Sequence, residues 1–312
     1  MVVGHKIWPE LLQLFTELQR IYDENKQSDT SKFMEKANAK AEFSTTLLTK
    51  YTIMAWIPSS LTLSLTTLIY SLIKNGFIDV QTLYTTYKIT LPWDQTKLFG
   101  WILETIISVF VGCAYLLINN TFMSFFVGIC YYHRAFRAHI QELIQKINYK
   151  NDQLKAKLIL TETIQFHYSA RSFFRQSTEV YSLFILMVLI CSIVSLSCSV
   201  FQFDLALRVE FNMSTLVFIT IAMTAIGLNL FLYSYFGHGA NENHMEISDC
   251  FYQSEWYNLP LYLQKYYVII IANAQRPLHY HGSGVAFINL NTFIRMLRNV
   301  MSFYTMFKAL TT

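Results

Sequence analysis

The stretch VYSLFILMVLICSIVSLSCSVFQF, residues 180–203, decides the fold class because it contains no charged side chain. As a helix, a run of this length exceeds the hydrocarbon core of a bilayer, which is about 30 Å thick. Residues 51–73, 105–132 and 211–241 are further runs without Asp, Glu, Lys or Arg. The pattern predicts four membrane-spanning helices.

The last quarter of the chain is less regular. Residues 261–274 are apolar but only 14 residues long and include Lys265, so we expect a buried or interfacial helix that does not cross. After the breaker-rich stretch 277–284, residues 285–310 are apolar enough to cross again. The sequence therefore predicts an all-α, polytopic membrane helical bundle with five spans.

Lys and Arg residues set the expected orientation, since they collect on the cytoplasmic side of a membrane. Seven lie in residues 1–50 and eight in residues 133–176, whereas the connection between the third and fourth spans has only Arg208. We expect a cytoplasmic N-terminus and an extracellular C-terminus. Asn212, in the motif Asn-Met-Ser, would then lie outside the cell as a glycosylation acceptor.

The composition supports lipid as the solvent, with 53% hydrophobic and 14% charged residues. The net charge of +4 is spread over several loops, so no basic face favours nucleic acid. The odd number of five cysteines implies no disulfide framework. His279 and His281 have no neighbouring cluster of Cys or carboxylates, and we expect neither a metal nor a cofactor.

One pattern resembles an enzyme motif. His244 and Asp249 form the HxxxxD arrangement of membrane acyltransferases, in which the carboxylate would orient a histidine acting as general base. No Gly-rich or Arg-containing motif accompanies it, so we favour a solvated polar turn. We expect a protein that is not an enzyme and keep the acyltransferase as a remote alternative.

Arg295 and Arg298 interrupt the last predicted span. A charged side chain in a bilayer is costly unless it is paired or hydrated, and their spacing of three puts both on one helical face. Two interpretations stay open. The pair faces a polar protein interface or the headgroups, or it lines a water-filled vestibule.

Several blocks in the last quarter, at matching spacing, resemble the C-terminal region of insect odorant receptors. The family's Pro-aromatic-Asp motif also has a counterpart before the second predicted span. In order, the blocks are Leu91-Pro-Trp-Asp94, Asn241-Glu242, Cys250-Phe-Tyr252, Trp256-Tyr-Asn-Leu-Pro260, Ala274-Gln-Arg-Pro-Leu278, FINLNTF at 287–293, and Ser302-Phe-Tyr-Thr305.

The resemblance implies a subunit of an odorant-gated cation channel. Such receptors have seven spans, and the first segment here resembles the loop after their second span. We therefore expect a truncated or incomplete receptor or a divergent subunit. The resemblance also implies the plasma membrane of a sensory neuron dendrite, a small volatile apolar odorant, and a hetero-tetramer with a co-receptor subunit in membrane lipid. A non-conducting subunit or remnant is the alternative.

The resemblance divides the chain into functional segments. Residues 1–50 are a cytoplasmic amphipathic segment, 51–236 a four-span bundle with the odorant pocket in its outer half, 237–284 a cytoplasmic anchor, and 285–312 the pore-lining helix. It assigns the pore and gate to Thr305, Met306 and Leu310; the odorant pocket to Leu65, Leu68, Leu72 and Phe110; and the anchor contacts to Tyr252, Trp256, Tyr257 and Pro260.

Overall fold

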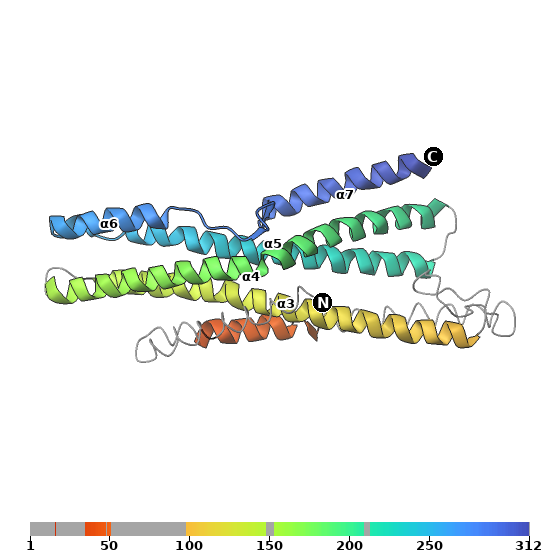
Figure 1. Cartoon of the computed structure of the whole chain (residues 1–312), viewed down its shortest axis with the longest axis horizontal. Helices are drawn as coiled ribbons and strands as arrows, with labels where there is room; N and C mark the ends of the chain where they lie inside the picture. Colours follow the sequence, from red (N-terminus) through yellow and green to blue (C-terminus); the bar gives the residue numbers. More distant parts are fainter. Residues whose placement is uncertain are drawn as a thin grey trace. The chain divides into compact units, whose positions relative to one another are not determined.

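The computed structural model describes residue 16 and residues 35–47, 49–50, 98–147, 153–208 and 213–311, and these residues are almost entirely helical (Figure 1). The elements beyond residue 97 are, in order, α3 (Leu98–Lys146), α4 (Gln153–Arg208), α5 (Met213–Tyr252), the 3-10 helix η2 (Trp256–Asn258), α6 (Leu261–Ala274), β1 (His281–Gly282), β2 (Ala286–Phe287) and α7 (Leu290–Thr311). The expected all-α fold is confirmed.

The chain divides into two compact units that alternate along the sequence. Unit 1 comprises Met1–Phe43, Phe125–Cys191 and Leu230–Leu297, and unit 2 comprises Ser44–Ser124, Ser192–Asn229 and Arg298–Thr312. Helices α3, α4, α5 and α7 therefore each contribute residues to both units.

Two helices of the described residues, Leu154–Arg208 and Leu216–Asn258, are long and apolar enough to cross a membrane. The first contains the predicted span 180–203 and the second contains residues 216–241 of the predicted span 211–241, so the expectation of apolar membrane helices is confirmed for these. The predicted span 51–73 lies outside the described residues. Five crossings and their direction stay predictions.

The helices are longer than the predicted spans. Segment 133–176, expected to connect two spans, is helical over nearly all its described residues. The reason lies in the apolar spacing, which continues with buried Phe136 and Ile140 in α3 and with buried Phe166 and Phe173 in α4. This spacing buries one face of each helix while the basic side chains occupy the other.

Unit 1 has an aromatic core in which large rings from several elements pack edge to face. Phe136 and Phe173 join α3 to α4 with ring centroids 5.6 Å apart, and Phe251 joins α5 to Tyr267 of α6 at 5.8 Å. Figure 1 shows α6 alongside the end of α5. Ring pairs at these angles add to the stabilisation from burial.

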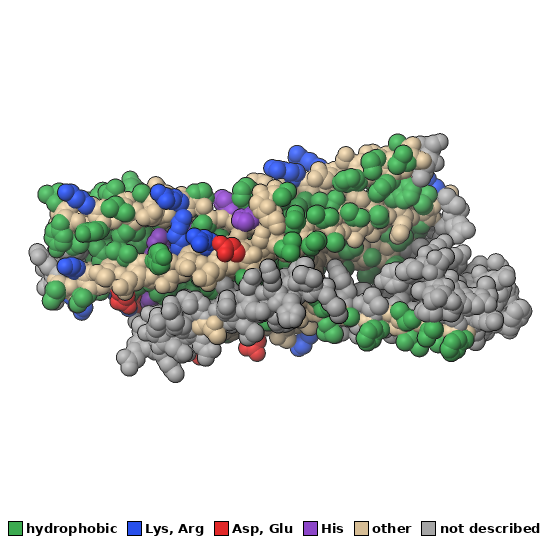
Figure 2. All heavy atoms as spheres, in the orientation of Figure 1, with side chains coloured by type: hydrophobic (Ala, Val, Ile, Leu, Met, Phe, Trp, Pro, Cys, Tyr) green, Lys and Arg blue, Asp and Glu red, His purple; other side chains and the backbone are tan. Residues whose placement is uncertain are grey.

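Unit 2 packs differently, with much of its apolar surface outside. Phe201 of α4 meets Phe307 of α7 at 6.0 Å, yet Val194, Val217 and Met301 are each 54% exposed. Figure 2 shows hydrophobic side chains over the visible parts of α4, α5 and α7 in this unit. Contiguous apolar surface of this kind marks a face that meets lipid or another protein.

The predicted last span begins later than expected. Residues 281–287 form a hairpin in which His281 pairs with Phe287 and Gly282 with Ala286. Its turn uses Ser283 and Gly284, both with positive φ, a conformation that glycine adopts readily. Helix α7 starts only at Leu290.

The start of α7 is capped. Asn289 Oδ1 accepts a hydrogen bond of 2.7 Å from the backbone N–H of Thr292. This bond satisfies one of the N–H groups that the first helical turn leaves without a partner. Asn289 thus ends the hairpin segment and begins the helix.

Candidate functional site

The predicted anchor residues lie around the turn between α5 and α6. Tyr252 ends α5 and Trp256 begins η2. Pro260 precedes α6 with φ −56° and ψ 143°, and the helix runs from Leu261 to Ala274. The predicted bounds of this short helix are confirmed. It begins directly after Pro260 because proline lacks an N–H and is tolerated at the start of a helix.

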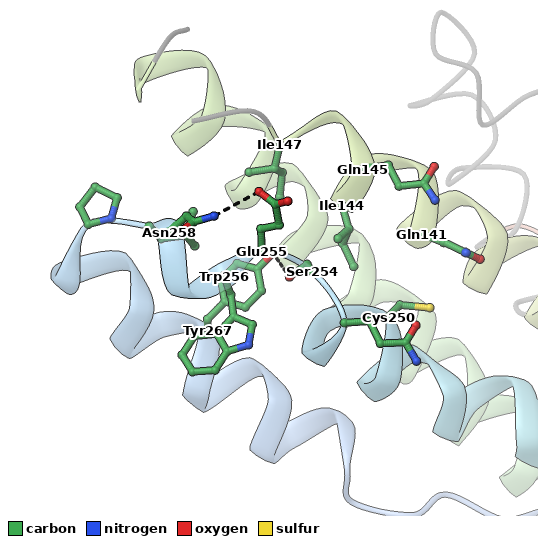
Figure 3. Close-up of a pocket in the computed structure, with 13 residues that line it drawn as sticks. Gln141, Ile144, Gln145, Ile147, Cys250, Ser254, Glu255, Trp256, Asn258 and Tyr267 are labelled. Atoms are coloured by element: carbon green, nitrogen blue, oxygen red, sulfur yellow. Dashed lines mark hydrogen bonds between the residues drawn. The ribbon is translucent and has the colours of Figure 1, made fainter. Parts of the chain in front are cut away.

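A recess of about 940 Å³ opens beside this turn (Figure 3). Trp256 and Pro260 line it, whereas Tyr252 and Tyr257 do not. Amides are the commonest polar groups in the lining. The full set is Gln141, Ile144, Gln145, Ile147, Cys250, Gln253, Ser254, Glu255, Trp256, Asn258, Leu259, Pro260 and Tyr267.

Hydrogen bonds hold the turn in shape. Gln264 Nε2 donates to the carbonyls of Tyr257 at 2.9 Å and Leu259 at 2.7 Å. Asn258 donates to Glu255 at 3.2 Å, as the dashed line in Figure 3 shows. The two bonds from Gln264 satisfy backbone carbonyls at the chain reversal.

The titratable groups of the recess favour a binding role over catalysis. Burial raises the pKa of Tyr267, although its contact with Ser254 at 3.3 Å opposes that shift. Burial also raises the pKa of the Cys250 thiol, which keeps it in the unreactive protonated form. The recess therefore offers polar contacts and no activated nucleophile.

An exposed apolar face of α6 adjoins the turn. Leu261, Tyr262, Val268 and Ile269 are each more than half exposed, and we call these four residues the α6 face. Tyr257 is also 64% exposed nearby. Aromatic and aliphatic side chains in this arrangement are the type enriched at the centres of protein interfaces.

Helix α7 has two unlike faces. Met296 and Val300 are buried, and Phe307 packs on α4. On the opposite face, exposed polar residues recur at intervals of four, three, four and three positions. This α7 polar stripe consists of Asn291, Arg295, Arg298, Ser302 and Thr305.

The predicted gate residues lie on or beside this stripe. Thr305 belongs to it, and Met306 and Leu310 are 47% and 77% exposed. None of the three packs into the interior of unit 2. Arg295 and Arg298, which share a face as their spacing predicted, lie on the same stripe as Thr305.

Of the predicted odorant contacts, Phe110 lies within the described residues. Leu65, Leu68 and Leu72, together with the glycosylation candidate Asn212, lie outside the described residues. Phe110 lies on α3 with 73% of its side chain exposed.

The sequence predicts a solvated turn at the acyltransferase pattern. In the structure these residues are part of helix α5 instead. His244 is buried and Asp249 is exposed. Positions five apart on a helix differ by about 140° in direction, so this carboxylate lies on another face and cannot orient the imidazole. The expectation of a solvated turn is wrong because the apolar spacing of α5 continues through these residues.

His244 instead belongs to a buried group of histidines that the sequence analysis missed. Its ring lies parallel to that of His167, with centroids 6.5 Å apart. Burial, with the charge of Arg171, lowers the pKa of His167 to about 4 and that of His244 to about 3. Both are neutral near pH 7. Helical spacing among phenylalanines was the only signal that could have found them.

The remaining histidine pair has a structural role. His281 Nδ1 accepts a hydrogen bond of 3.1 Å from Gly284 N–H and so closes the hairpin turn. The ring of His279 packs on Phe287 at 5.4 Å. Within the part of the chain that the structure describes, no group of three His, Cys, Asp or Glu side chains is arranged to hold a metal ion.

Comparisons with known proteins identify the fold and the family. The chain matches the 7tm Odorant receptor family over residues 8–301. The insect olfactory receptor OR5 from Machilis hrabei in complex with eugenol is similar in structure, with a TM-score of 0.68, 13% identity, and coverage of 90% of this chain and 70% of that chain.

A second structure of OR5 from Machilis hrabei matches with a TM-score of 0.67 and 11% identity, over 98% of this chain and 78% of that chain. Identities this low establish a shared fold and no more. A comparison with curated proteins finds no match. The family match covers most of the sequence, and the helical architecture agrees with it: the chain belongs to the 7tm odorant receptor family.

Proposed function

We propose that this odorant receptor is the ligand-binding subunit of a heteromeric, odorant-gated cation channel. The observation that carries the proposal is the α7 polar stripe. A helix that crosses lipid with Arg295, Arg298 and Thr305 exposed on one face needs water or polar partners along that face. A central pore lined by this helix would supply the water.

The stripe leads to a gating hypothesis. Thr305 and Met306 would form the constriction, with Leu310 further towards the outside. Met306 would contribute to an apolar ring. Such a ring can close a narrow pore by excluding water, and outward movement of the helix would let water return to the pore. Odorant opens the channel if it binds the open state better than the closed state.

Assembly would use the anchor. In this proposal residues 237–284 lie in the cytoplasm. The α6 face contacts neighbouring subunits of a tetramer that includes a co-receptor, together with Tyr252, Trp256, Tyr257 and Pro260. The exposure of four apolar side chains on one short helix supports this assignment, since contiguous exposed apolar surface marks a site of contact with protein or membrane.

The anchor assignment can be tested by Ile269→Asp, because Ile269 is 58% exposed on the α6 face. A carboxylate there would have to be desolvated on assembly, so co-purification with the co-receptor should fall strongly. Tyr168→Asp is the matched control, since Tyr168 is 73% exposed on α4 of the same unit. Equal loss of co-purification in both variants would contradict the assignment.

The ligand would be a small, mostly apolar odorant in the outer half of the bundle formed by residues 51–236. A cavity lined by aliphatic and aromatic side chains suits such a ligand, and Leu65, Leu68, Leu72 and Phe110 are the proposed contacts. Residues 1–50 would be cytoplasmic and residues 285–312 would form the pore helix. The protein would act in the plasma membrane of sensory dendrites.

Recording odour-evoked current tests the function directly. The chain is co-expressed with a co-receptor, its presence at the cell surface is measured by labelling, and a broad panel of volatile compounds is applied. We expect a cation current that the co-receptor alone does not give. No additional current with surface expression verified would favour the non-conducting subunit instead.

A further inference from the structure

Tyr280 lies in the segment between α6 and α7, and its side chain is fully buried. Its hydroxyl is 2.8 Å from His133 Nε2 of α3 and 2.8 Å from Ser177 Oγ of α4. Its ring packs against Phe126 and Phe174 with centroids 5.2 Å and 4.7 Å away. One side chain thus joins the segment before α7 to two long helices of unit 1.

The direction of these hydrogen bonds follows from the donors available. Ser177 Oγ donates its hydrogen to the carbonyl of Phe174 at 2.8 Å, so towards Tyr280 it accepts. The phenol therefore donates to Ser177, and it accepts from His133, whose Nε2 must carry the hydrogen. Both hydrogen-bonding capacities of the buried hydroxyl are used.

The backbone around Tyr280 is tied to α5 as well. Asn241 Oδ1 accepts from Tyr280 N–H and Asn241 Nδ2 donates to the carbonyl of Ile288, both at 3.1 Å. Ile288 N–H donates to the carbonyl of Tyr280 at 2.8 Å. A single amide side chain thus bridges the two ends of the hairpin.

Two close approaches complete the docking of this segment. A Cβ atom on Gly237 of α5 would lie 2.4 Å from Ile288 Cγ2. A Cβ atom on Gly282 would lie 3.0 Å from the backbone of Leu186 in α4. The segment is held by α3, α4 and α5, and α7 begins two residues after Ile288.

We propose that Tyr280 is a positioning residue for gating, whose hydroxyl, held by His133 and Ser177, fixes the start of α7 until channel opening loosens it. This inference rests on the proposed channel function. The ring and the hydroxyl have separable tasks, because the ring fills the aromatic core and the hydroxyl makes the ties. Removing the oxygen alone should keep the fold and free the start of α7.

The test uses Tyr280→Phe in the full chain, co-expressed with the co-receptor. Loss of two buried hydrogen bonds should shift the gating equilibrium by about tenfold, so the odorant concentration for half-maximal current falls about tenfold and basal current rises. Surface density should stay close to that of the unsubstituted chain. An unchanged or raised half-maximal concentration at equal surface density overturns the proposal.

Thr178→Val is the matched control. Thr178 is also buried in α4 and donates to the carbonyl of Phe174 at 2.8 Å, but its hydroxyl makes no hydrogen bond to Tyr280 in the described contacts. We expect no shift in half-maximal concentration. Ser177→Ala and the double variant Ser177→Ala/Tyr280→Phe should give shifts that do not add; additive shifts count against the shared tie.

A second readout separates this inference from the channel hypothesis. If the unsubstituted chain carries no current, the proposed function is wrong. Hydrogen–deuterium exchange of the purified receptor then tests the positioning role of Tyr280 without any current. Tyr280→Phe should speed amide exchange in residues 281–297, whereas Thr178→Val should not. Unchanged exchange in that segment overturns the inference.

Discussion

Units 1 and 2 differ in which side chains their long helices bury and which they expose. Unit 1 buries polar side chains among its aromatic rings, as Tyr280 shows with its bonds to His133 and Ser177 and its contact with Phe174. Unit 2 exposes apolar ones, with Val194 and Val217 each 54% exposed. The buried contacts of unit 1 join its own helices, whereas we propose that the exposed apolar side chains of unit 2, like the α6 face of unit 1, meet lipid or other subunits.

The largest expected effect comes from a core side chain of unit 1. Phe174 is 1% exposed and its ring meets those of His133, His244 and Tyr280. Phe174→Ala should destabilise the fold by about 3–5 kcal/mol. Val194→Ala in unit 2 should change stability by less than about 0.5 kcal/mol.

Thermal unfolding of the detergent-solubilised receptor, followed by size-exclusion chromatography, measures this contrast. We expect Phe174→Ala to melt well below the unsubstituted protein or to fail to reach the cell surface. If both variants melted at the same temperature, the distinction between the units would be wrong.

A pair of glycines on α5 gives an intermediate effect. A Cβ on Gly237 would meet Ile288 at 2.4 Å, whereas one on Gly239 would meet nothing within 4 Å. Gly237→Ala should cost about 1–3 kcal/mol because a branched buried side chain must move. Gly239→Ala should be neutral or stabilising by up to about 1 kcal/mol, since alanine favours the helix.

The same melting assay compares the two variants. The predicted order is Gly239→Ala at or above the unsubstituted receptor and Gly237→Ala below it. Equal melting temperatures would show that Ile288 does not depend on the close approach to α5.

Acid should weaken unit 1. His167 and His244 have pKa values lowered to about 4 and about 3, below the unperturbed value of 6.5. As pH falls below 6.5, the unfolded chain binds protons that the folded chain does not, so the free energy of unfolding falls. The loss continues until the pH reaches the folded values.

Melting temperatures between pH 7.5 and pH 5.5 measure this effect, above the range in which most carboxylates titrate. His244→Phe removes one of the groups while keeping a ring next to Phe174, so its melting temperature should fall less steeply with acid. An identical slope in the variant would remove His244 from the account.

The smallest effect should come from charge on the α7 polar stripe. Fixed positive charge in a vestibule disfavours cation entry, so Arg295→Gln/Arg298→Gln should raise unitary cation conductance by about twofold at low salt. Lys308→Gln is the control, because Lys308 lies on the half-buried side of α7. A conductance that responds equally to both substitutions would place the arginines elsewhere.

Features of the fold that depend on local periodicity could be predicted from the sequence. The uncharged run 180–203 and the bounds of α6 are examples, since Pro260 marks where the short helix begins. Arg295 and Arg298 were expected on one face for the same reason. The exposed position of Thr305 opposite Phe307 also agrees with helical spacing.

Contacts between distant parts of the chain could not be predicted. Tyr280 bonds to residues 103 and 147 positions away in sequence, and no local pattern links them. The polar residues around His244 favour a turn in the sequence, although the apolar spacing of α5 continues through them. In segment 133–176 the many charged residues likewise favour a connecting loop, although the apolar residues between them form the buried face of a helix.

Cysteine accessibility tests most directly whether α7 lines the pore with its polar stripe. Thr305→Cys is compared with Phe307→Cys, which faces α4, in a background where the exposed Cys191 and Cys198 are serine. A charged thiol reagent applied during odorant stimulation should block current through Thr305→Cys and leave Phe307→Cys unaffected. Equal block of both variants, or block of Phe307→Cys alone, would contradict the account.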